Sequence, residues 1–409
     1  MAEESDRLIT AGTPIFRRTT LALFAAGFST FAVLYCVQPL MPVFADEFHV
    51  SPAESSLSLS LPCAMLALAL LVVSPLSEVW GRKPIMVASL FASAILTLIA
   101  VIVPSWHGFL ALRALTGLAA SGLPAVAMAY LSEEMDARAI GLSMGLLIGG
   151  NAMGGMVGRL IAGIITDHAS WRVGLGTIGI LALVAAILFW RGLPPSRRFL
   201  PNRMRWRQEP GTFGQHFRDP GLPWLFAEAF LLMGGFVSVY NYIGFRLLDP
   251  PYNLSQSAIG AIFVVYLAGT FSSAVTGEIA SRLGRRRVLW LAILLGLVGI
   301  LMTLSERLPL IIAGIVVVTV SFFGVHSVAS SWIGRRALRD RAQASSVYLC
   351  LYYLGSSVLG TAGGWFFEHA GWSGVVAFFG ALYGLALAIA LRLSRLPPLV
   401  PGPSSDPDR

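Results

Sequence analysis

The sequence predicts an all-α integral membrane protein with twelve transmembrane helices, arranged as two six-helix bundles. Three observations lead to this fold class. Of the 409 residues, 56% are apolar and only 12% are charged, a balance that a water-exposed domain does not tolerate. Apolar segments of ~20 residues, the length of helix that crosses a bilayer, recur along the chain with short polar breaks. The pattern of the first half also returns in the second half.

The apolar segments define the expected spans and the domains between them. The first six spans are predicted at Thr19 to Phe44, Ser55 to Ser77, Pro84 to Val103, Phe109 to Leu131, Ile140 to Ile165 and Arg172 to Trp190. The second six are predicted at Leu222 to Arg246, Ser257 to Ile279, Val288 to Leu304, Leu310 to Gly334, Ala344 to Phe367 and Gly374 to Arg392. We therefore expect bundles at residues 19–190 and 222–395, a basic cytoplasmic linker at 191–221, and cytoplasmic tails at 1–18 and 396–409.

The distribution of basic residues predicts how the chain is oriented. Cytoplasmic loops of membrane proteins carry an excess of Lys and Arg. Placing the amino terminus in the cytoplasm puts 24 of the 29 basic residues on that side, against only Arg172, Arg246 and Arg307 on the other. We expect a multi-pass protein of the plasma membrane, the inner membrane of a bacterium, with both termini in the cytoplasm.

The two halves repeat in the same orientation. Asp167–Trp171 corresponds to Glu368–Trp372, and Gly81-Arg82-Lys83 corresponds to Gly284-Arg285-Arg286. Six spans per half is an even number, so both copies enter the membrane from the same side. Such a parallel repeat predicts a pseudo-two-fold axis along the membrane normal and a substrate path between the halves.

Two loop motifs carry a family resemblance. The first copy runs from Ser74 to Lys83, and the second runs from Gly277 to Arg286. Both resemble the loop signature Gly-x-x-x-Asp-Arg-x-Gly-Arg-Arg of the major facilitator superfamily. The first copy departs from the signature at Ser74 and Val79, and the second has Ser281 in place of the acid. The matching residues are Glu78, Gly81, Arg82 and Lys83 in the first copy, and Gly277, Arg282, Gly284, Arg285 and Arg286 in the second.

Further motifs extend the resemblance over essentially the whole chain. Arg113 and Gly117 are similar to the superfamily pattern of the fourth helix. The fifth helix resembles the Gly-x-x-x-Gly-Pro exporter signature, with Arg159 in the proline position. Gln38-Pro39, Gly149–Arg159 and Asn241–Gly244 are similar to the YnfM-type branch of bacterial efflux permeases. The resemblance implies a proton-driven exporter in which two bundles alternate access to a central site.

Four titratable or charged residues fall inside apolar spans, namely Arg113, Arg159, Glu228 and His326. A charge in hydrocarbon costs ~3 kcal/mol or more, so such residues tend to face a cavity or a partner. Their positions along their helices put Arg159 and Glu228 at similar depths, and we expect both to border a central cavity. Glu228 is predicted to carry protons, with a snorkelling or fixed carboxylate as the alternative.

Arg159 is predicted either to supply a cation near Glu228 or to hold an anionic substrate, unless it only reaches the outer interface. Arg113 has two open interpretations, a structural anchor and a proton relay. His326 is either a titrating group or, as is commoner, a hydrogen-bonded interior residue.

Small and polar residues complete the candidate set. Polar side chains that contact either substrate or neighbouring helices are Gln38, Asn151, Tyr240, Asn241 and Tyr242. Glycines that allow close helix approach across the interface of the halves are Gly154, Gly158, Gly163, Gly355 and Gly364. At the two loop motifs, glycine is expected to permit a tight turn while the charged residues hold one transport state or only set the topology.

These features predict a secondary transporter that exports a drug, sugar or metabolite in exchange for protons. The alternatives are an uptake symporter or facilitated-diffusion carrier with the same fold and, from a different class, a nontransporting membrane sensor. We expect small-molecule substrate, protons and membrane lipid as partners, no nucleic acid, and a functional monomer. No enzyme motif, cofactor site or metal-ligand spacing is found in the sequence.

Overall fold

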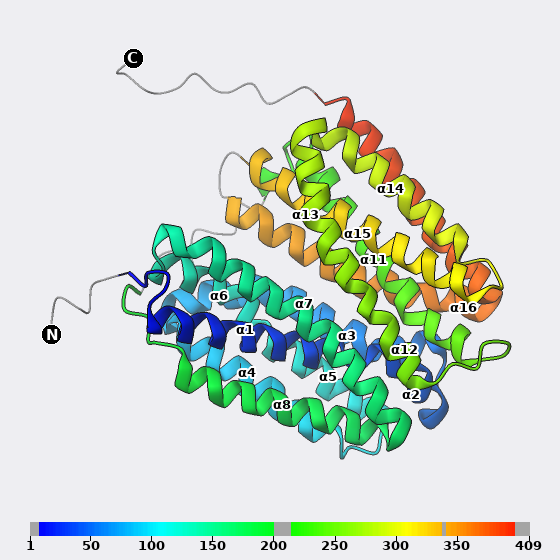
Figure 1. Cartoon of the computed structure of the whole chain (residues 1–409), viewed down its shortest axis with the longest axis horizontal. Helices are drawn as coiled ribbons and strands as arrows, with labels where there is room; N and C mark the ends of the chain where they lie inside the picture. Colours follow the sequence, from blue (N-terminus) through cyan, green and yellow to red (C-terminus); the bar gives the residue numbers. More distant parts are fainter. Residues whose placement is uncertain (1–7, 200–213, 338–340, 397–409) are drawn as a thin grey trace.

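The computed structural model describes residues 8–199, 214–337 and 341–396, and it is built almost entirely from long helices (Figure 1). The remaining parts of the predicted tails and of the predicted linker, residues 1–7, 200–213 and 397–409, lie outside the described residues.

The first bundle contains the first six spans. The first span is broken into α1 (Pro14–Tyr35), the short 3-10 helix η2 (Gln38–Leu40) and α2 (Met41–Phe48). Prolines lack the N–H that continues a helix, and Pro39 and Pro42 lie at this break. The next spans are α3 (Pro52–Trp80), α4 (Arg82–Ala100), α5 (Trp106–Ala120) with α6 (Gly122–Glu134), α7 (Ala137–His168) and α8 (Trp171–Gly192).

The second bundle repeats this order. Its elements are α11 (Leu222–Leu248), α12 (Gln256–Ile262), the 3-10 helix η3 (Phe263–Val265), α13 (Tyr266–Leu283), α14 (Arg285–Met302), α15 (Leu308–Arg336) and α16 (Arg341–Ser394). Within α16, Ala370 and Gly371 have non-helical backbone angles, so α16 comprises two spans that meet at this kink.

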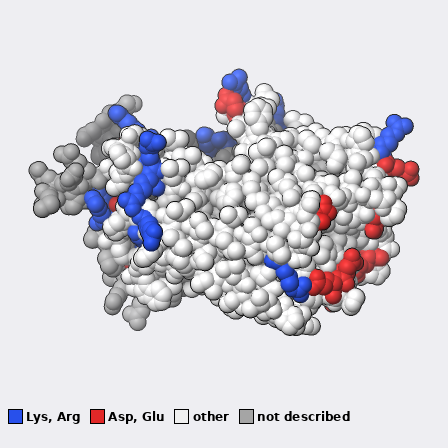
Figure 2. Space-filling view, turned by 60° about the horizontal axis from the view of Figure 1, so that its bottom comes forward, with Lys and Arg blue, Asp and Glu red and all other residues white. Residues whose placement is uncertain are grey.

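The described helices confirm the predicted fold class. Ten helical segments are long and apolar enough to cross a membrane within the described residues. The kink divides the one in α16 into two spans, and α14, which begins with three arginines, supplies the twelfth. Large apolar side chains lie on the outside, such as Ile102 and Phe271, which are 79% and 74% exposed. Charged residues gather in patches around broad uncharged areas of the surface (Figure 2). Lipid contact accounts for this exposed apolar surface.

The two bundles converge at one end and diverge at the other (Figure 1). We call the end where α12 packs against α7, and α2 against α11, the closed end. Hydrogen bonds there join the bundles through Ser56 and Ser60 on α3, both bonded to Thr361 on α16. The opposite end carries the turns at Gly81 and Gly284, and we call it the open end. A site between the bundles is thus shut off at the closed end.

Candidate substrate and coupling site

Arg159 lies at a junction between the two bundles. Its side chain on α7 is buried; Nε donates to Oε1 of Gln38 at 2.8 Å and Nη1 donates to the Gly155 carbonyl at 2.7 Å. Gln38 in turn donates through Nε2 to Oδ1 of Asn241 on α11, also at 2.8 Å. The break in the first span makes this possible, because it presents Gln38 on η2 between α7 and α11. One polar chain therefore crosses from the first bundle to the second.

Aromatic rings surround the guanidinium of Arg159. Its central carbon lies 4.4 Å from the ring centre of Tyr35, 4.6 Å from that of Phe263 and 5.0 Å from that of Tyr266. Cation–π attraction of this kind offsets part of the cost of burying the charge. Among the described residues no carboxylate pairs with Arg159, and Nη2 has no hydrogen bond to any of them. The Nη1–Nη2 edge can therefore receive a polar or anionic group.

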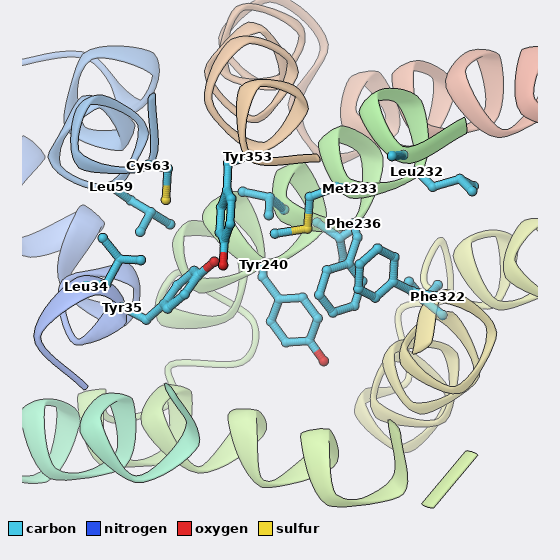
Figure 3. Close-up of a cluster of buried hydrophobic side chains, with 14 of the residues drawn as sticks. Leu34, Tyr35, Leu59, Cys63, Leu232, Met233, Phe236, Tyr240, Phe322 and Tyr353 are labelled. Atoms are coloured by element: carbon cyan, nitrogen blue, oxygen red, sulfur yellow. The ribbon is translucent and has the colours of Figure 1, made fainter. Parts of the chain in front are cut away.

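An aromatic cluster extends from this junction into the second bundle (Figure 3). Tyr35 from α1 and Tyr353 from α16 point their hydroxyl groups toward one another in the close-up. Tyr240 on α11 bonds through its hydroxyl to Oγ1 of Thr319 at 2.6 Å, and its ring lies 5.1 Å from that of Tyr266. The surroundings of the junction are thus largely apolar, with a few hydroxyl groups, as in many small-molecule sites.

Glu228 is a second buried charge, on α11 toward the open end. The side chain is completely buried, and neither carboxyl oxygen has a hydrogen-bond partner in the part of the chain that is described. Tyr348 and Tyr383 lie within range of its charge. Tyr348 is hydrogen-bonded to Nδ1 of His326 at 2.9 Å. Tyr348 is thus bonded to His326, whereas no hydrogen bond joins it to Glu228.

Arg159 does not pair with Glu228 in this arrangement, which was one of the alternative roles predicted for Arg159. Arg159 bonds to Gln38 and Gly155, in the part of α7 nearer the closed end. Glu228 lies within two turns of the start of α11 at Leu222, near the open end. Counting residues gave similar depths, but it could not include the break in the first span, which draws the guanidinium toward η2.

Arg113 binds three backbone carbonyl groups. Its Nε donates to Ser58 at 3.0 Å, Nη1 to Val33 at 2.9 Å and Nη2 to Leu34 at 2.7 Å. Pro62 has no N–H for the carbonyl four residues earlier, which is that of Ser58. The other two carbonyls belong to the last turn of α1, where helical partners are missing. This geometry favours the anchor over the proton relay, because Arg113 donates only to backbone carbonyls that lack a helical N–H partner. The Val33 carbonyl also accepts a hydrogen bond from Sγ of Cys36 at 3.5 Å.

The remaining polar candidates lie in helix contacts away from Arg159. Asn151 packs against Gly27 of α1, where an added Cβ would come within 2.4 Å of Asn151 Oδ1. Tyr242 donates its hydroxyl to the Gly360 carbonyl at 2.9 Å, and thereby joins α11 to α16. Tyr242 thus shows the helix-to-helix bonding that was the alternative to substrate contact, whereas Asn151 shows close packing between α7 and α1.

The five packing glycines divide into two groups. Gly163 lies against Gly260, and Gly364 against Ala53, so these two allow the bundles to approach each other at the closed end. The others lie against helices of their own bundle and not across the interface as expected, because they occupy other turns or faces of α7 and α16. Their contacts are Gly154 with Phe28, Gly158 with Ala32 and Gly355 with Phe230.

The first loop motif forms a buried ion-pair cluster. Gly81 has a φ of 92°, a value that favours glycine, and turns the chain between α3 and α4. Arg82 is paired with Glu78 at 2.7 Å and with Glu133 at 2.6 Å. Lys83 donates to the carbonyl of Leu193. Glu133 was not among the site residues predicted from the sequence. Its place at the end of a span, on the same side of the membrane as the basic turn, could have indicated this pairing.

The second loop motif has a different charge pattern. Gly284 turns the chain with a φ of 88°. Arg285 donates to Oγ of Ser331 at 3.1 Å, and Arg286 donates to the Ser394 carbonyl at 3.2 Å. Arg282 forms an exposed ion pair with Glu278 at 2.7 Å, and Gly277 lies beside Ser327.

Two carboxylates join the bundles at the closed end. Asp167 at the end of α7 accepts hydrogen bonds from the backbone N–H groups of Gln256 and Ser257 at 3.3 and 3.2 Å, and from Ser257 Oγ at 2.6 Å. Glu368 accepts from the N–H of Ala53 at 3.1 Å. Each acid meets the amino-terminal end of a helix in the other bundle, which favours negative charge. Neither was among the predicted site residues, although their repetition in the sequence marked them.

The described residues contain no group of three or more His, Cys, Asp or Glu side chains that could hold a metal ion.

Two repeated six-helix bundles with a buried arginine at their junction define a membrane transporter in which a solute passes between the halves. The Major Facilitator Superfamily profile matches residues 23–249 and 247–408. The chain belongs to this superfamily, and it is a multi-pass membrane transporter and not an enzyme.

Curated relatives match over nearly their full lengths. The chain is 50% identical to the inner membrane transport protein YnfM of Escherichia coli (strain K12), covering 96% of this chain and 94% of the relative. It is 46% identical to an uncharacterized MFS-type transporter of Bacillus subtilis (strain 168), YybF, covering 95% and 96%. The predicted YnfM-type resemblance is confirmed.

Solved structures share the fold at low sequence identity. A bacterial homolog of the human lysosomal transporter Spinster, in an inward-facing and occupied conformation, superposes with a TM-score of 0.78 at 14% identity, covering 94% of this chain and 98% of that one. The nucleoside transporter NupG gives 0.72 at 15% identity, covering 91% and 98%.

Proposed function

We propose that the protein exports a small solute across the bacterial inner membrane in exchange for protons. The proposal places both termini and the open end on the cytoplasmic side, in agreement with the excess of Lys and Arg there. The YnfM relative, named as an inner membrane transport protein, supports this location. In this orientation the conformation is open to the cytoplasm and closed to the outside.

The observation that carries proton coupling is the carboxyl group of Glu228. It is completely buried and has no hydrogen-bond partner among the described residues. An ionised carboxylate in such surroundings is costly, whereas a protonated one is tolerated. A rearrangement of the bundles that admits water to Glu228 would allow it to release its proton.

The solute is proposed to bind at the Arg159 junction. The free edge of the guanidinium would receive a polar or anionic group, and the rings of Tyr35, Phe263 and Tyr266 would contact the apolar body. Because Gln38 and Asn241 belong to different bundles, a solute that engages them changes the contact between the bundles. Binding is thereby linked to the change of access.

The test uses purified protein in proteoliposomes that contain a pH-sensitive dye. Drugs, sugars and metabolites are presented one at a time, with and without an imposed proton gradient. The proposal predicts solute-dependent proton movement that is lost in Glu228→Gln and retained in Glu306→Gln, which changes an exposed acid. Solute flux without proton movement in the unmodified protein would instead establish facilitated diffusion or another coupling ion.

A further inference from the structure

The open end carries two cavities at corresponding places in the two repeats. The first, of about 470 Å³, is lined by the turn Trp80–Pro84 together with residues such as Trp190 and Phe199. The second, of about 590 Å³, is lined by the turn Leu283–Arg287 with Trp332, Arg335 and Arg336. Equivalent turns thus form both cavities, and their charges can be compared position by position.

The comparison shows that the two acidic residues that pair with Arg82 at the first cavity have no acidic counterparts at the second. The spacing between Gly81 and Gly284 places Ser281 at the position of Glu78. At the other side of the cavity, α15 ends in Arg335 and Arg336 where α6 ends in Glu133 and Glu134. Both acids that pair with Arg82 are therefore replaced, one of them by a further cation. The same spacing replaces Pro84 by Arg287. Acidic side chains of the protein thus balance the charge of Arg82 at the first turn, whereas no acids at the corresponding positions balance the arginines of the second turn.

Five arginines line the second cavity, and within the described residues only one has an acidic partner. Arg336 pairs with Asp219 at 2.5 Å. Arg285 and Arg286 donate to a serine hydroxyl and a carbonyl, which carry no charge. The positive charge of Arg335 also acts unfavourably on Arg285. An anion in the cavity would relieve this repulsion.

The position of the cavity favours a lipid as the source of that anion. It lies where α13 and α15 end and α14 begins, and the ends of membrane spans lie near the lipid headgroups. Half-buried Trp332 and Leu283, which is 60% exposed, belong to the same lining. Tryptophan is enriched at this level of membrane proteins, and basic pockets between helices on the cytoplasmic side bind anionic headgroups. Guanidinium groups match phosphate oxygens in paired hydrogen bonds.

We propose that the arginine cavity at the Leu283–Arg287 turn binds the phosphate of an anionic membrane lipid. The bound phosphate bridges arginines from the start of α14 and the end of α15. The site is separate from the Arg159 junction and does not depend on the direction or coupling of transport.

The experiment measures retention of phosphatidylglycerol on the full-length protein by native mass spectrometry. One variant combines Arg285→Gln, Arg287→Gln and Arg335→Gln, and a charge-matched control combines Arg17→Gln, Arg138→Gln and Arg282→Gln. The control residues lie at the open end but outside the cavity. Arg287 and Arg335 are exposed, so the pair Arg287→Gln and Arg335→Gln provides a second, milder variant. Thermal unfolding in phosphatidylcholine nanodiscs checks that each variant is folded.

The cavity variant is expected to bind phosphatidylglycerol on the order of 100-fold more weakly, and the milder variant on the order of 20-fold more weakly. The control variant should retain most of the affinity for phosphatidylglycerol. None of the proteins should bind phosphatidylcholine strongly. Equal losses in the cavity variant and the control would overturn the site. Displacement of the lipid by millimolar inorganic phosphate would overturn the assignment to lipid, because a soluble anion would then be the ligand.

Discussion

The two carboxylates at the closed end predict how the conformational balance can be shifted. Asp167 and Glu368 each meet the amino-terminal end of a helix in the opposite bundle. Combining Asp167→Asn with Glu368→Gln removes both charges and keeps the side-chain shapes. We expect the closed end to separate more often, because these contacts hold the bundles together in the observed conformation.

The size of the effect follows from the exposure of the two acids. Both side chains are exposed, and an exposed anion at a helix amino terminus contributes about 0.3–1 kcal/mol. Losing two such contacts costs the closed arrangement ~0.6–2 kcal/mol, which corresponds to roughly a 3- to 30-fold change in the ratio of open to closed molecules.

The assay is a distance measurement between spin labels on cysteines that replace His107 and Leu310. These exposed residues belong to the first and second bundle at the closed end. The double variant should increase the population with the longer distance. Asp249→Asn is the control, because it removes an exposed negative charge from the same end without touching the other bundle. An unchanged distribution in the double variant, or an equal shift in the control, would refute the reasoning.

Three further predictions concern stability and gating. Arg113→Gln should destabilise the protein by on the order of 3 kcal/mol, because the buried carbonyls of Ser58, Val33 and Leu34 lose their hydrogen bonds from Arg113. Thermal unfolding in detergent would measure this loss. An unchanged melting temperature would exclude the anchor role. Gly154→Ala should lower stability by ~1–3 kcal/mol, because the new Cβ would lie 2.0 Å from the Phe28 carbonyl oxygen. Gly145→Ala is the control: its new Cβ would meet nothing within 4 Å, so it should leave the stability unchanged in the same assay. Arg82→Gln should lower the population of the observed conformation in the spin-label assay, because it removes the ion pairs that Arg82 makes with Glu78 and Glu133. Loss of membrane insertion instead would support a purely topological role.

The membrane fold was predictable because each span needs its own apolar segment, and hydropathy marks every one of them. The breaks within spans were harder to predict. Pro39 and Pro42 interrupt the first span, yet membrane helices tolerate prolines, as α3 does with Pro62 and Pro75. Whether a proline breaks or only bends a helix depends on partners such as Arg113, which a single sequence does not reveal.

The site was predictable in its residues but not in its pairings. A charged residue is easy to recognise inside an apolar span, and Arg159 and Glu228 were identified in this way. The distance between them depends on helix tilt and on the break at η2. Glu133, Asp167 and Glu368 lie near span ends, where charges are common, so only their partners in space distinguish them from ordinary loop residues.

We propose that solute binding at the Arg159 junction and proton exchange at Glu228 are separable parts of one transport cycle. Two activities of the same proteoliposomes test this, namely exchange of labelled for unlabelled solute and accumulation of solute driven by a proton gradient. We expect Glu228→Gln to retain exchange and lose accumulation, and Arg159→Gln to lose both. Accumulation at the unmodified rate in Glu228→Gln, or undiminished exchange in Arg159→Gln, would contradict it.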